Sequence, residues 1–255
     1  MSRVFITGSS DGLGLMAGRL LSEQGHEVVL HARNAARAAD AQRALPGTVV
    51  VSGDVSSIAG AKSVAEQANA LGRFDAVIHN VAVGYREPRR IETVDKLPQV
   101  FAVNVLAPYI LTALMHRPQR LIYLSSALHR STTAHLDDIF WQKRTWDGTE
   151  AYSETKLYDT MLAFAIARRW PDVFSNALEP GWVPTKMGGS EASDDIDQAH
   201  LTQAWLAASD DARVTGQYFY HMERRAPNPQ AEDKSLQDRL IDLCEEASQH
   251  IYLPT

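Results

Sequence analysis

Two hydrophobic patterns alternate along the chain. Short runs, several of them nearly all apolar, predict strands, and longer stretches with helical spacing predict helices between them. The predicted strands are residues 3–7, 27–31, 48–52, 76–79, 120–124, 174–178 and 217–221, and the main predicted helices are residues 13–24, 58–71, 94–115, 151–170 and 195–208. Strands that are apolar on both faces are typical of a parallel sheet covered by helices on both sides. We therefore expect an α/β fold with a doubly wound parallel sheet of about seven strands.

Three segments lack this regular pattern. Residues 127–150 are polar and without clear periodicity, and residues 186–200 contain two adjacent glycines and a run of acids. We expect both to be loops at the substrate site. Residues 223–233, with two prolines, predict an irregular link before a terminal helix. No internal repeat divides the chain, so we expect a single domain over residues 1–255.

The composition excludes several classes of protein. The formal net charge of −6 and the pI near 5.8 provide no positive field for a nucleic acid. The single cysteine, Cys244, rules out an internal disulfide and a cysteine metal cage, and the nine histidines show no metal-binding spacing, so no metal is expected. The longest apolar stretch, residues 103–115, is too short to span a membrane, and the start leaves no room for a secretion signal. We expect a cytoplasmic protein.

A glycine-rich turn follows the first predicted strand. The run Thr7-Gly8-Ser9-Ser10-Asp11-Gly12-Leu13-Gly14 leads directly into a predicted helix. Glycines at such a turn let backbone amides and the helix N-terminus approach a pyrophosphate. By itself the motif also fits a turn that binds no ligand.

The end of the second predicted strand bears on the choice of nucleotide. An acid there would bind the ribose 2'-hydroxyl of NAD, but the chain has His31-Ala32-Arg33. The Arg33 guanidinium suits the 2'-phosphate of NADP, although a solvated surface arginine would look the same. Asp11 would oppose the phosphate if it faced the ribose, unless it caps the following helix. We expect NADP(H) to be preferred, with NAD(H) as the alternative.

A second group of polar residues suggests acid–base chemistry. Tyr152 and Lys156 lie four residues apart and so share one helix face, where the ammonium would lower the pKa of the phenol. Ser125 and Ser126 follow an apolar strand, at the edge where open α/β sheets bind ligands. Asn104 interrupts an apolar helix. Each of these features also has an ordinary structural interpretation.

Read in order, these residues resemble the short-chain dehydrogenase/reductase family over nearly the whole chain. The resemblance implies a Rossmann fold and a catalytic set of Asn104, Ser126, Tyr152 and Lys156. It also implies that Asp54 and Val55 meet the adenine, and that Asn80 is the strand-end asparagine of the family. The implied cofactor contacts are Gly8, Ser10, Gly12, Leu13, Gly14, Arg33, Asp54, Val55, Asn80, Tyr152, Lys156, Pro180, Gly181, Val183 and Thr185.

Within the family, the chain looks similar to retinol-dehydrogenase-like members. Ser125-Ser126 followed by His129, residues 215–219 and the proline-containing tail at residues 227–233 support this likeness. The strand-end motif departs from the usual Asn-Asn-Ala-Gly, because this chain has His79-Asn80-Val81-Ala82. This departure puts the close backbone packing at Val81 and Ala82 in doubt, and His79 is expected to be structural.

The resemblance implies interconversion of a carbonyl and its alcohol. Tyr152 would act as general acid or base, Ser126 would bind the carbonyl oxygen, Lys156 would hold the nicotinamide ribose and Asn104 would anchor a water. A sugar-nucleotide epimerase or dehydratase is disfavoured, since such relatives have a different glycine spacing and a longer C-terminal domain. A non-catalytic nucleotide sensor is the other alternative.

The substrate pocket is expected from Tyr85, Arg86 and residues 127–146 and 187–195. The aromatic residues Phe140, Trp141, Trp146 and Trp182 would favour an apolar or aromatic carbonyl, unless they fill the core. His129 and His135 are expected at the surface or in the pocket lining. Residues 188–197 are predicted to form a mobile flap. Self-association into a homodimer or homotetramer through the helices holding Asn104 and Tyr152 is a further expectation.

Overall fold

The computed structural model describes residues 1–254. Its centre is an eight-stranded sheet in the order β3-β2-β1-β4-β5-β6-β7-β8, in which all neighbours are parallel except the antiparallel pair β7 and β8. The strands are β1 (Arg3–Ile6), β2 (Glu27–Ala32), β3 (Val49–Ser52), β4 (Ala76–His79), β5 (Arg120–Leu124), β6 (Phe174–Leu178), β7 (Tyr218–Tyr220) and β8 (Glu223–Arg224). The predicted parallel α/β sheet is confirmed.

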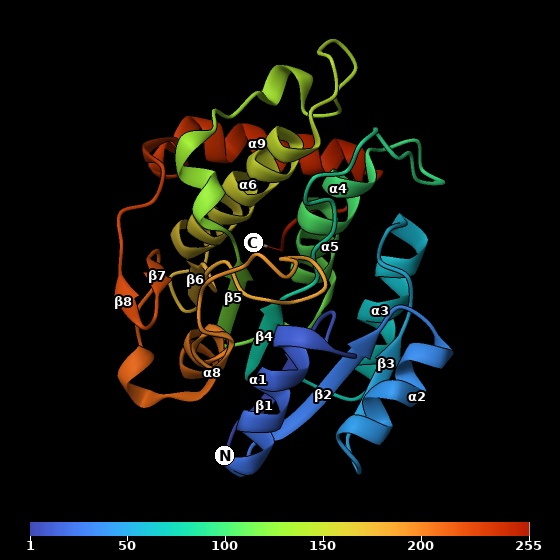
Figure 1. Ribbon diagram of the computed structural model, residues 1–255, viewed down its shortest axis with the longest axis vertical. Coiled ribbons are helices and arrows are strands. Elements are labelled where there is room, and N and C mark those ends of the chain that lie inside the picture. Colours follow the sequence, from blue (N-terminus) through green and yellow to red (C-terminus); the bar gives the residue numbers. More distant parts are fainter. Residues whose placement is uncertain (255) are drawn as a thin grey trace.

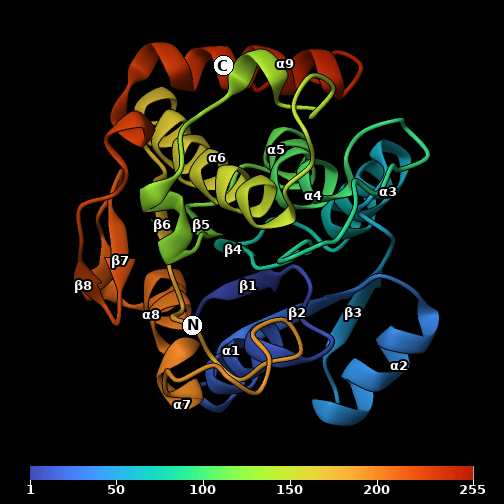
Figure 2. The same ribbon diagram turned by 45° about the horizontal axis from the view of Figure 1, so that its top comes forward.

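Helices cover both faces of this sheet (Figure 1). The view in Figure 2 separates the layers: α1, α2 and α8 lie on one face, α3, α5 and α6 lie on the other, and α9 lies across α6 as a further layer. The helices are α1 (Gly12–Glu23), α2 (Ala35–Ala44), α3 (Ile58–Ala70), α4 (Gln99–Phe101), α5 (Ala107–Leu114), α6 (Gly148–Arg169), α7 (Ile196–Ala199), α8 (Leu201–Ala208) and α9 (Lys234–Ala247).

Alternation along the strands produces two apolar cores. In β1, Phe5 packs into the core beneath α3, α5 and α6, whereas Val4 and Ile6 pack into the core beneath α1 and α8. Successive side chains of a strand point to opposite faces, so a strand that is buried on both sides tends to be apolar along most of its length. This requirement explains why the strand predictions agree closely with the structure.

The structure differs from the predicted elements in three places. The helix expected at residues 94–115 begins only at Gln99, after Pro98, and contains a π-helical turn at Ala102–Leu106. Helix α2 was not among the predicted helices because it buries only Ala41 and shows little apolar periodicity. Strand β8 lies within the segment expected to be irregular, and both of its residues are exposed.

Helix α6 is enclosed by other parts of the chain. All of its residues from Ala151 to Ile166 are buried, and α9 and the segment Pro229–Glu232 pack against it. The Tyr109 hydroxyl of α5 donates to the Ile251 carbonyl, so the C-terminal segment covers α5 as well. None of the helices in residues 1–254 has both the length and the apolar character needed to cross a bilayer.

Candidate active site

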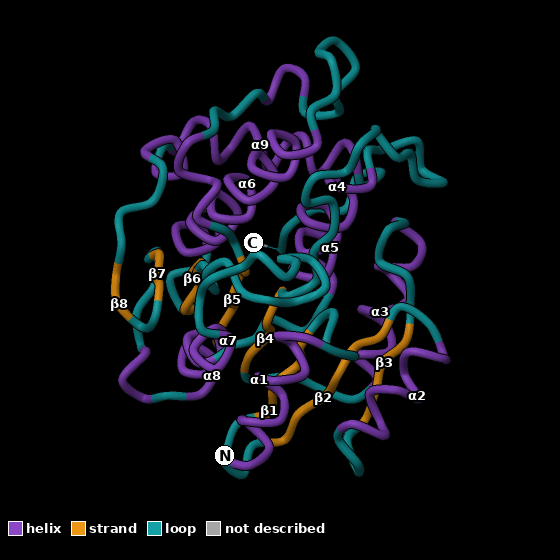
Figure 3. The backbone as a smooth tube through the Cα atoms, in the orientation of Figure 1, coloured by secondary structure: helices purple, strands orange, loops and turns teal. Residues whose placement is uncertain are grey.

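The sequence-predicted residues gather at the carboxyl ends of the central strands. Strands β1 and β4 are neighbours, and the chain order of the sheet reverses between them. Open α/β sheets bind ligands at such a point. The glycine-rich turn after β1 and Asn80 after β4 meet here, and Ser125 and Ser126 follow β5 on the same edge. In Figure 3 these strand ends face the long loop that precedes α7.

The glycine-rich turn packs against the end of β4 more closely than any side chain would permit. Gly8 has a φ of +61°, and a Cβ placed on it would lie 2.8 Å from the Val81 Cα. A Cβ on Gly14 would lie 2.5 Å from the Asn80 Nδ2. Val81 therefore keeps the close backbone packing that the departure from the family motif had put in doubt, because the space is made by Gly8.

Asn80 and Thr7 fasten this turn. The Asn80 amide nitrogen Nδ2 donates to the carbonyl oxygens of Thr7 and Gly8 at 2.9 and 3.0 Å. The Thr7 hydroxyl accepts hydrogen bonds from the backbone amides of Asn80 and Val81.

His79, by contrast, is buried behind the cleft, where its Nε2 lies 3.1 Å from the Thr112 hydroxyl and burial lowers its pKa to about 3. It is therefore neutral and structural.

The ribose end of the cleft is rich in cations. Arg33 is exposed and forms no hydrogen bond or ion pair within residues 1–254. Asp11 does not cap α1; its carboxylate instead binds Arg37 at 2.7 Å and Lys186 at 2.6 Å. Burial alone would raise the pKa of Asp11, but these two cations lower it below its ordinary value. The capping role considered for Asp11 is therefore wrong.

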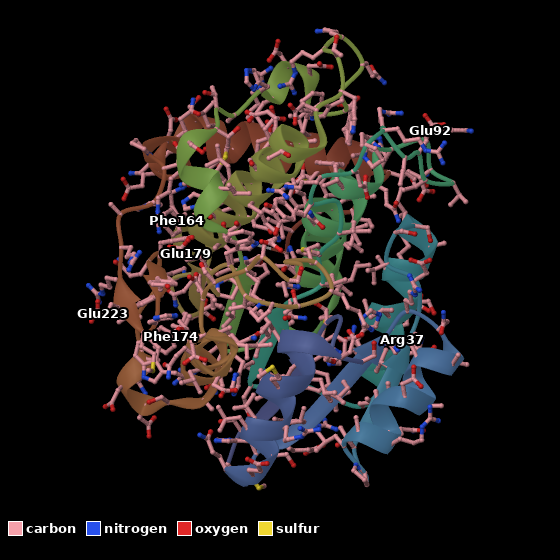
Figure 4. All side chains as sticks on the ribbon, viewed as in Figure 1. Arg37, Glu92, Phe164, Phe174, Glu179 and Glu223 are labelled. Carbon is pink, nitrogen blue, oxygen red and sulfur yellow. The ribbon has the colours of Figure 1, made fainter. Side chains whose placement is uncertain are left out.

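Arg37 is a residue that the sequence reasoning missed. It projects from α2 toward the glycine-rich turn (Figure 4), and its guanidinium also donates to the Ser10 hydroxyl at 3.2 Å. A second arginine shortly after Arg33 could have indicated this residue, but the sequence analysis did not predict the helix α2 that carries it.

The residues expected at the adenine, Asp54 and Val55, follow β3. Val55 is buried, and the exposed Asp54 accepts a hydrogen bond from the Ser56 amide at 2.9 Å.

Tyr152 lies on α6 at the floor of the cleft. Its ring packs edge-on against Tyr85, with the centroids 5.5 Å apart, and the Ser126 hydroxyl lies close enough to the phenol to lower its pKa. Burial raises the pKa of Tyr152, Asp159 and Tyr85 add to the increase, and Lys156 and Ser126 oppose it. Lys156 thus lowers the pKa of the phenol as expected, but burial outweighs the ammonium, and the net pKa of Tyr152 in the protein chain alone is raised.

Lys156 is held inside the protein. Its Nζ lies 5.7 Å from the centre of the Tyr152 ring and donates to the Leu124 carbonyl at 2.7 Å and to the Asp159 carboxylate at 2.8 Å. Burial by itself would lower the pKa of the ammonium, but the negative charge of Asp159 outweighs it and the pKa is raised. Asp159 is the second residue that the sequence analysis missed, although its position three residues after Lys156 places it beside that side chain.

Asn104 joins the π-helical turn to the site. Its Oδ1 accepts from the Val83 amide at 2.9 Å, and its Nδ2 donates to the Val83 carbonyl and to the Thr155 hydroxyl, both at 3.0 Å. Thr155 lies between Tyr152 and Lys156 on α6. Asn104 thus ties α6 to the segment after β4.

Two cavities adjoin at Tyr152. The first has a volume of about 350 Å³ and is lined by Leu13, Tyr85, Arg86, Ser125, Ser126, Ala127, Leu128, Tyr152, Pro180, Gly181, Trp182, Val183, Thr185, Met187 and Gly188. The second, of about 470 Å³, is lined by Gly8, Asp11, Gly12, Leu13, Asn80, Val81, Ala82, Leu124, Ser125, Tyr152, Lys156, Pro180, Pro184, Thr185, Lys186, Met187 and Ile196. Tyr152 and Pro180 line both cavities, so the reacting atoms of two ligands could meet there.

The second cavity fits a nicotinamide dinucleotide. A Cβ on Gly12 would meet nothing within 4 Å, so the turn leaves open space beside the start of α1 for a pyrophosphate. Lys156 and Thr185 offer donors at the opposite end, near the expected nicotinamide position. Val183 is buried, and the Thr185 hydroxyl accepts from the Gly188 amide at 3.1 Å, which fixes the segment after β6.

Several expected pocket residues lie elsewhere. Trp141 and Trp146 pack against each other with ring centroids 5.3 Å apart, and neither they nor Phe140 line the first cavity, which leaves Trp182 as the only one of the four that does. His129 is neither exposed nor in the pocket lining. It is fully buried, where its Nδ1 contacts the Ser126 carbonyl and its Nε2 accepts from the Asn228 amide.

His135 and two acids form a cluster that could attract a metal. The atoms of His135, Glu150 and Glu154 that could bind a metal all lie within 4.8 Å of one another. The guanidinium of Arg144 already binds Glu154 at 2.5 and 3.0 Å, which neutralises this carboxylate. The cluster is accounted for as part of an ion-pair network that holds the loop before α6.

Known proteins resemble this chain in sequence over most of its length. The profile described as short chain dehydrogenase matches residues 2–121. An uncharacterized oxidoreductase of Emericella nidulans is 47% identical, with 97% of each chain covered. A short-chain dehydrogenase of Gibberella zeae is 39% identical, with 96% of each covered. Human retinol dehydrogenase 13 is a more distant relative, 29% identical over 93% of this chain and 81% of its own.

Solved structures agree with the fold. An uncharacterized protein from Mycobacterium paratuberculosis superposes with a TM-score of 0.86 at 22% identity, over 100% of this chain and 96% of that one. A blue fluorescent protein from a metagenomic library, in complex with NADPH, gives 0.68 at 21% identity, over 85% and 95%. Together with the sequence relatives, these findings show that the chain belongs to the short-chain dehydrogenase/reductase family of NAD(P)-binding oxidoreductases.

Proposed function

We propose that this enzyme interconverts an apolar or aromatic aldehyde or ketone and its alcohol with NADP(H), using Tyr152 as the general acid and base. The observation that carries the proposal is the position of the Tyr152 phenol, which lies beside the Ser126 hydroxyl on the wall shared by the two cavities. A dinucleotide in the second cavity and a carbonyl in the first would meet at this phenol.

The dinucleotide supplies the hydride when it is bound. During reduction the carbonyl carbon gains that hydride, and the carbonyl oxygen takes the proton of the Tyr152 phenol. The Ser126 hydroxyl donates a hydrogen bond to the same oxygen as negative charge develops on it. Lys156, held by Leu124 and Asp159, places its positive charge beside the tyrosinate that is left, and it would hold the nicotinamide ribose of a bound dinucleotide.

Charge around the ribose supports the preference for NADP(H). Ala32 ends β2 where an acid would select NAD, and the exposed Arg33 follows it. The carboxylate of Asp11, which would repel a 2'-phosphate, is neutralised by Arg37 and Lys186. A fold relative is a complex with NADPH. NAD(H) remains the alternative cofactor.

The lining of the first cavity supports an apolar substrate. Most of its lining residues are apolar, Tyr85, Leu128 and Trp182 among them, and Arg86 is the only charged residue among those lining it. The Arg86 guanidinium lies 4.9 Å from the centre of the Tyr85 ring, so a cation–π contact engages it. Residues 188–197 begin in this lining at Gly188, and Ile196 lines the second cavity, so we propose that this segment acts as a flap over the site.

We also infer that the enzyme does not self-associate through α5 and α6. The family expectation was a homodimer or homotetramer joined by these helices. Here α9 and the C-terminal segment already cover them, and a partner would have to displace these parts and expose the apolar core around Leu240 and Ile241.

The test compares the wild type with Tyr152→Phe in a screen of aldehydes and ketones, following NADPH absorbance. The wild type should turn over aromatic or aliphatic carbonyls, and the variant should lose nearly all kcat while its NADPH affinity stays within about threefold, since a phenyl ring keeps the packing against Tyr85. Retention of most kcat by the variant would remove Tyr152 as the acid and base.

A further inference from the structure

The catalytic lysine is one half of a buried ion pair. The side chains of Lys156 and Asp159 are only 2% and 4% exposed, and their charged atoms lie 2.8 Å apart. The other oxygen of Asp159, Oδ1, has no hydrogen-bond partner among the described residues. Buried ion pairs add little net stability, because desolvation offsets the attraction between the charges. A carboxylate in this position therefore calls for an explanation other than stability.

The geometry limits what Asp159 can act on. Both residues lie on α6, which also carries Tyr152 one turn before Lys156. Strand β5 contributes the Leu124 carbonyl, which accepts a hydrogen bond from Lys156. It also contributes Tyr123, whose phenol forms a hydrogen bond of 2.8 Å with the Thr112 hydroxyl of α5. Within residues 1–254, Lys156 is the only charged group that acts appreciably on the Asp159 carboxylate, and no charged side chain from β6, α5 or α9 does so.

We propose that Asp159 is a positioning residue for the reaction, whose carboxylate keeps the Lys156 ammonium charged and directed toward β5 and keeps the Tyr152 phenol protonated. This inference rests on the proposed function, in which Tyr152 is the proton donor. Asp159 acts through Lys156 and by its charge, without touching the substrate.

The electrostatics of the cluster agree in direction with this role. The Asp159 charge contributes to the raised pKa of Tyr152 and of Tyr123, and it accounts for most of the raised pKa of Lys156. Burial raises the pKa of Asp159 itself to about 6, against the lowering effect of Lys156. Because the groups are coupled, a titration would report values that belong to the cluster.

The test is the pH profile of carbonyl reduction in Asp159→Asn, which keeps the shape of the side chain and removes its charge. The alkaline limb of kcat/KM should move to lower pH by about one unit, because the tyrosinate loses a nearby negative charge. The acid limb of alcohol oxidation should move in the same direction. A second variant, Asp159→Ser, also keeps a polar partner for Lys156 and should show the same shift.

Glu154→Gln is the matched control. Glu154 is also a buried carboxylate of α6, but it binds Arg144 and His135 and is not among the main contributions to the pKa of Tyr152. Its removal should lower the melting temperature and leave the pH profile in place. This outcome separates a general loss of a buried charge from the specific effect of Asp159.

The outcomes distinguish this inference from the proposed function. An unchanged alkaline midpoint in Asp159→Asn, together with an inactive Tyr152→Phe, would overturn the role of Asp159 alone. The same shift in Glu154→Gln as in Asp159→Asn would overturn it too, because the effect would then not depend on contact with Lys156. Full activity in Tyr152→Phe would overturn both proposals.

Discussion

Replacing Arg33 with alanine tests the cofactor preference directly. Arg33 follows Ala32 at the end of β2, and its exposed side chain has no protein partner within residues 1–254. Arg37, its neighbour on α2, already binds Ser10, Asp11 and Asp40. Arg33 is therefore the cation that can give its whole hydrogen-bonding capacity to a 2'-phosphate.

The size of the effect follows from the kind of contact. A charge-assisted hydrogen bond contributes about 1.5–3 kcal/mol, and each ~1.4 kcal/mol is a factor of ten in affinity. Because Arg33 is exposed, solvent and salt screen the interaction and the lower end of this range applies. We expect Arg33→Ala to lower kcat/KM for NADPH about tenfold and to change that for NADH by less than about twofold.

The assay measures kcat/KM for NADPH and NADH with one carbonyl substrate at low and high salt. Arg43→Ala is the control, since Arg43 is also an exposed arginine, in the last turn of α2, but forms a salt bridge with Asp40. The NADPH preference should shrink in Arg33→Ala, most clearly at low salt, and stay constant in Arg43→Ala. Equal values for the two nucleotides in the wild type, or an unchanged ratio in Arg33→Ala, would refute the reasoning.

Four further predictions concern other parts of the molecule. Lys156→Ala should reduce both kcat and NADPH affinity, because the ammonium serves the phenol and the ribose; a change in only one of them in steady-state and binding assays would contradict this dual role. Residues 188–197 should gain hydrogen-exchange protection when NADPH binds, and protection equal to that of the central strands in both states would exclude a flap. Sedimentation should show no dimer that depends on α5 and α6, and a dimer that is lost when exposed residues of these two helices are mutated would contradict the inference. Burial holds the pKa of His79 at about 3, so the native state binds fewer protons than the unfolded state between that value and about 6.5, and stability should fall as the pH drops through this window. In His79→Phe this part of the slope, up to ~1.4 kcal/mol per pH unit, should disappear, and equal slopes in urea unfolding of the two proteins would disprove it.

The sequence by itself determined the order of strands and helices and most of the chemistry-bearing residues. Strands β4, β5 and β6 have the predicted bounds, because strands buried on both faces are mostly apolar and stand out as short runs between polar segments. The glycine-rich turn, Ser126, Tyr152 and Lys156 were found because their spacing is local and their residue types are few. Such signals depend on neighbours in the chain and so can be read without the fold.

Tertiary structure decided what acts on these residues. Asp159 lies in an unremarkable helical stretch, and only the burial of α6 makes its charge matter to Lys156 and Tyr152. Asp11 could have capped α1, but Arg37 and Lys186, which lie 26 and 175 residues away, hold its carboxylate. Burial and charge pairing depend on contacts between distant segments, and the balance between desolvation and nearby charges in those contacts sets the sign of a pKa shift. For this reason the phenol of Tyr152 could be located from the sequence, but the direction of its pKa shift could not.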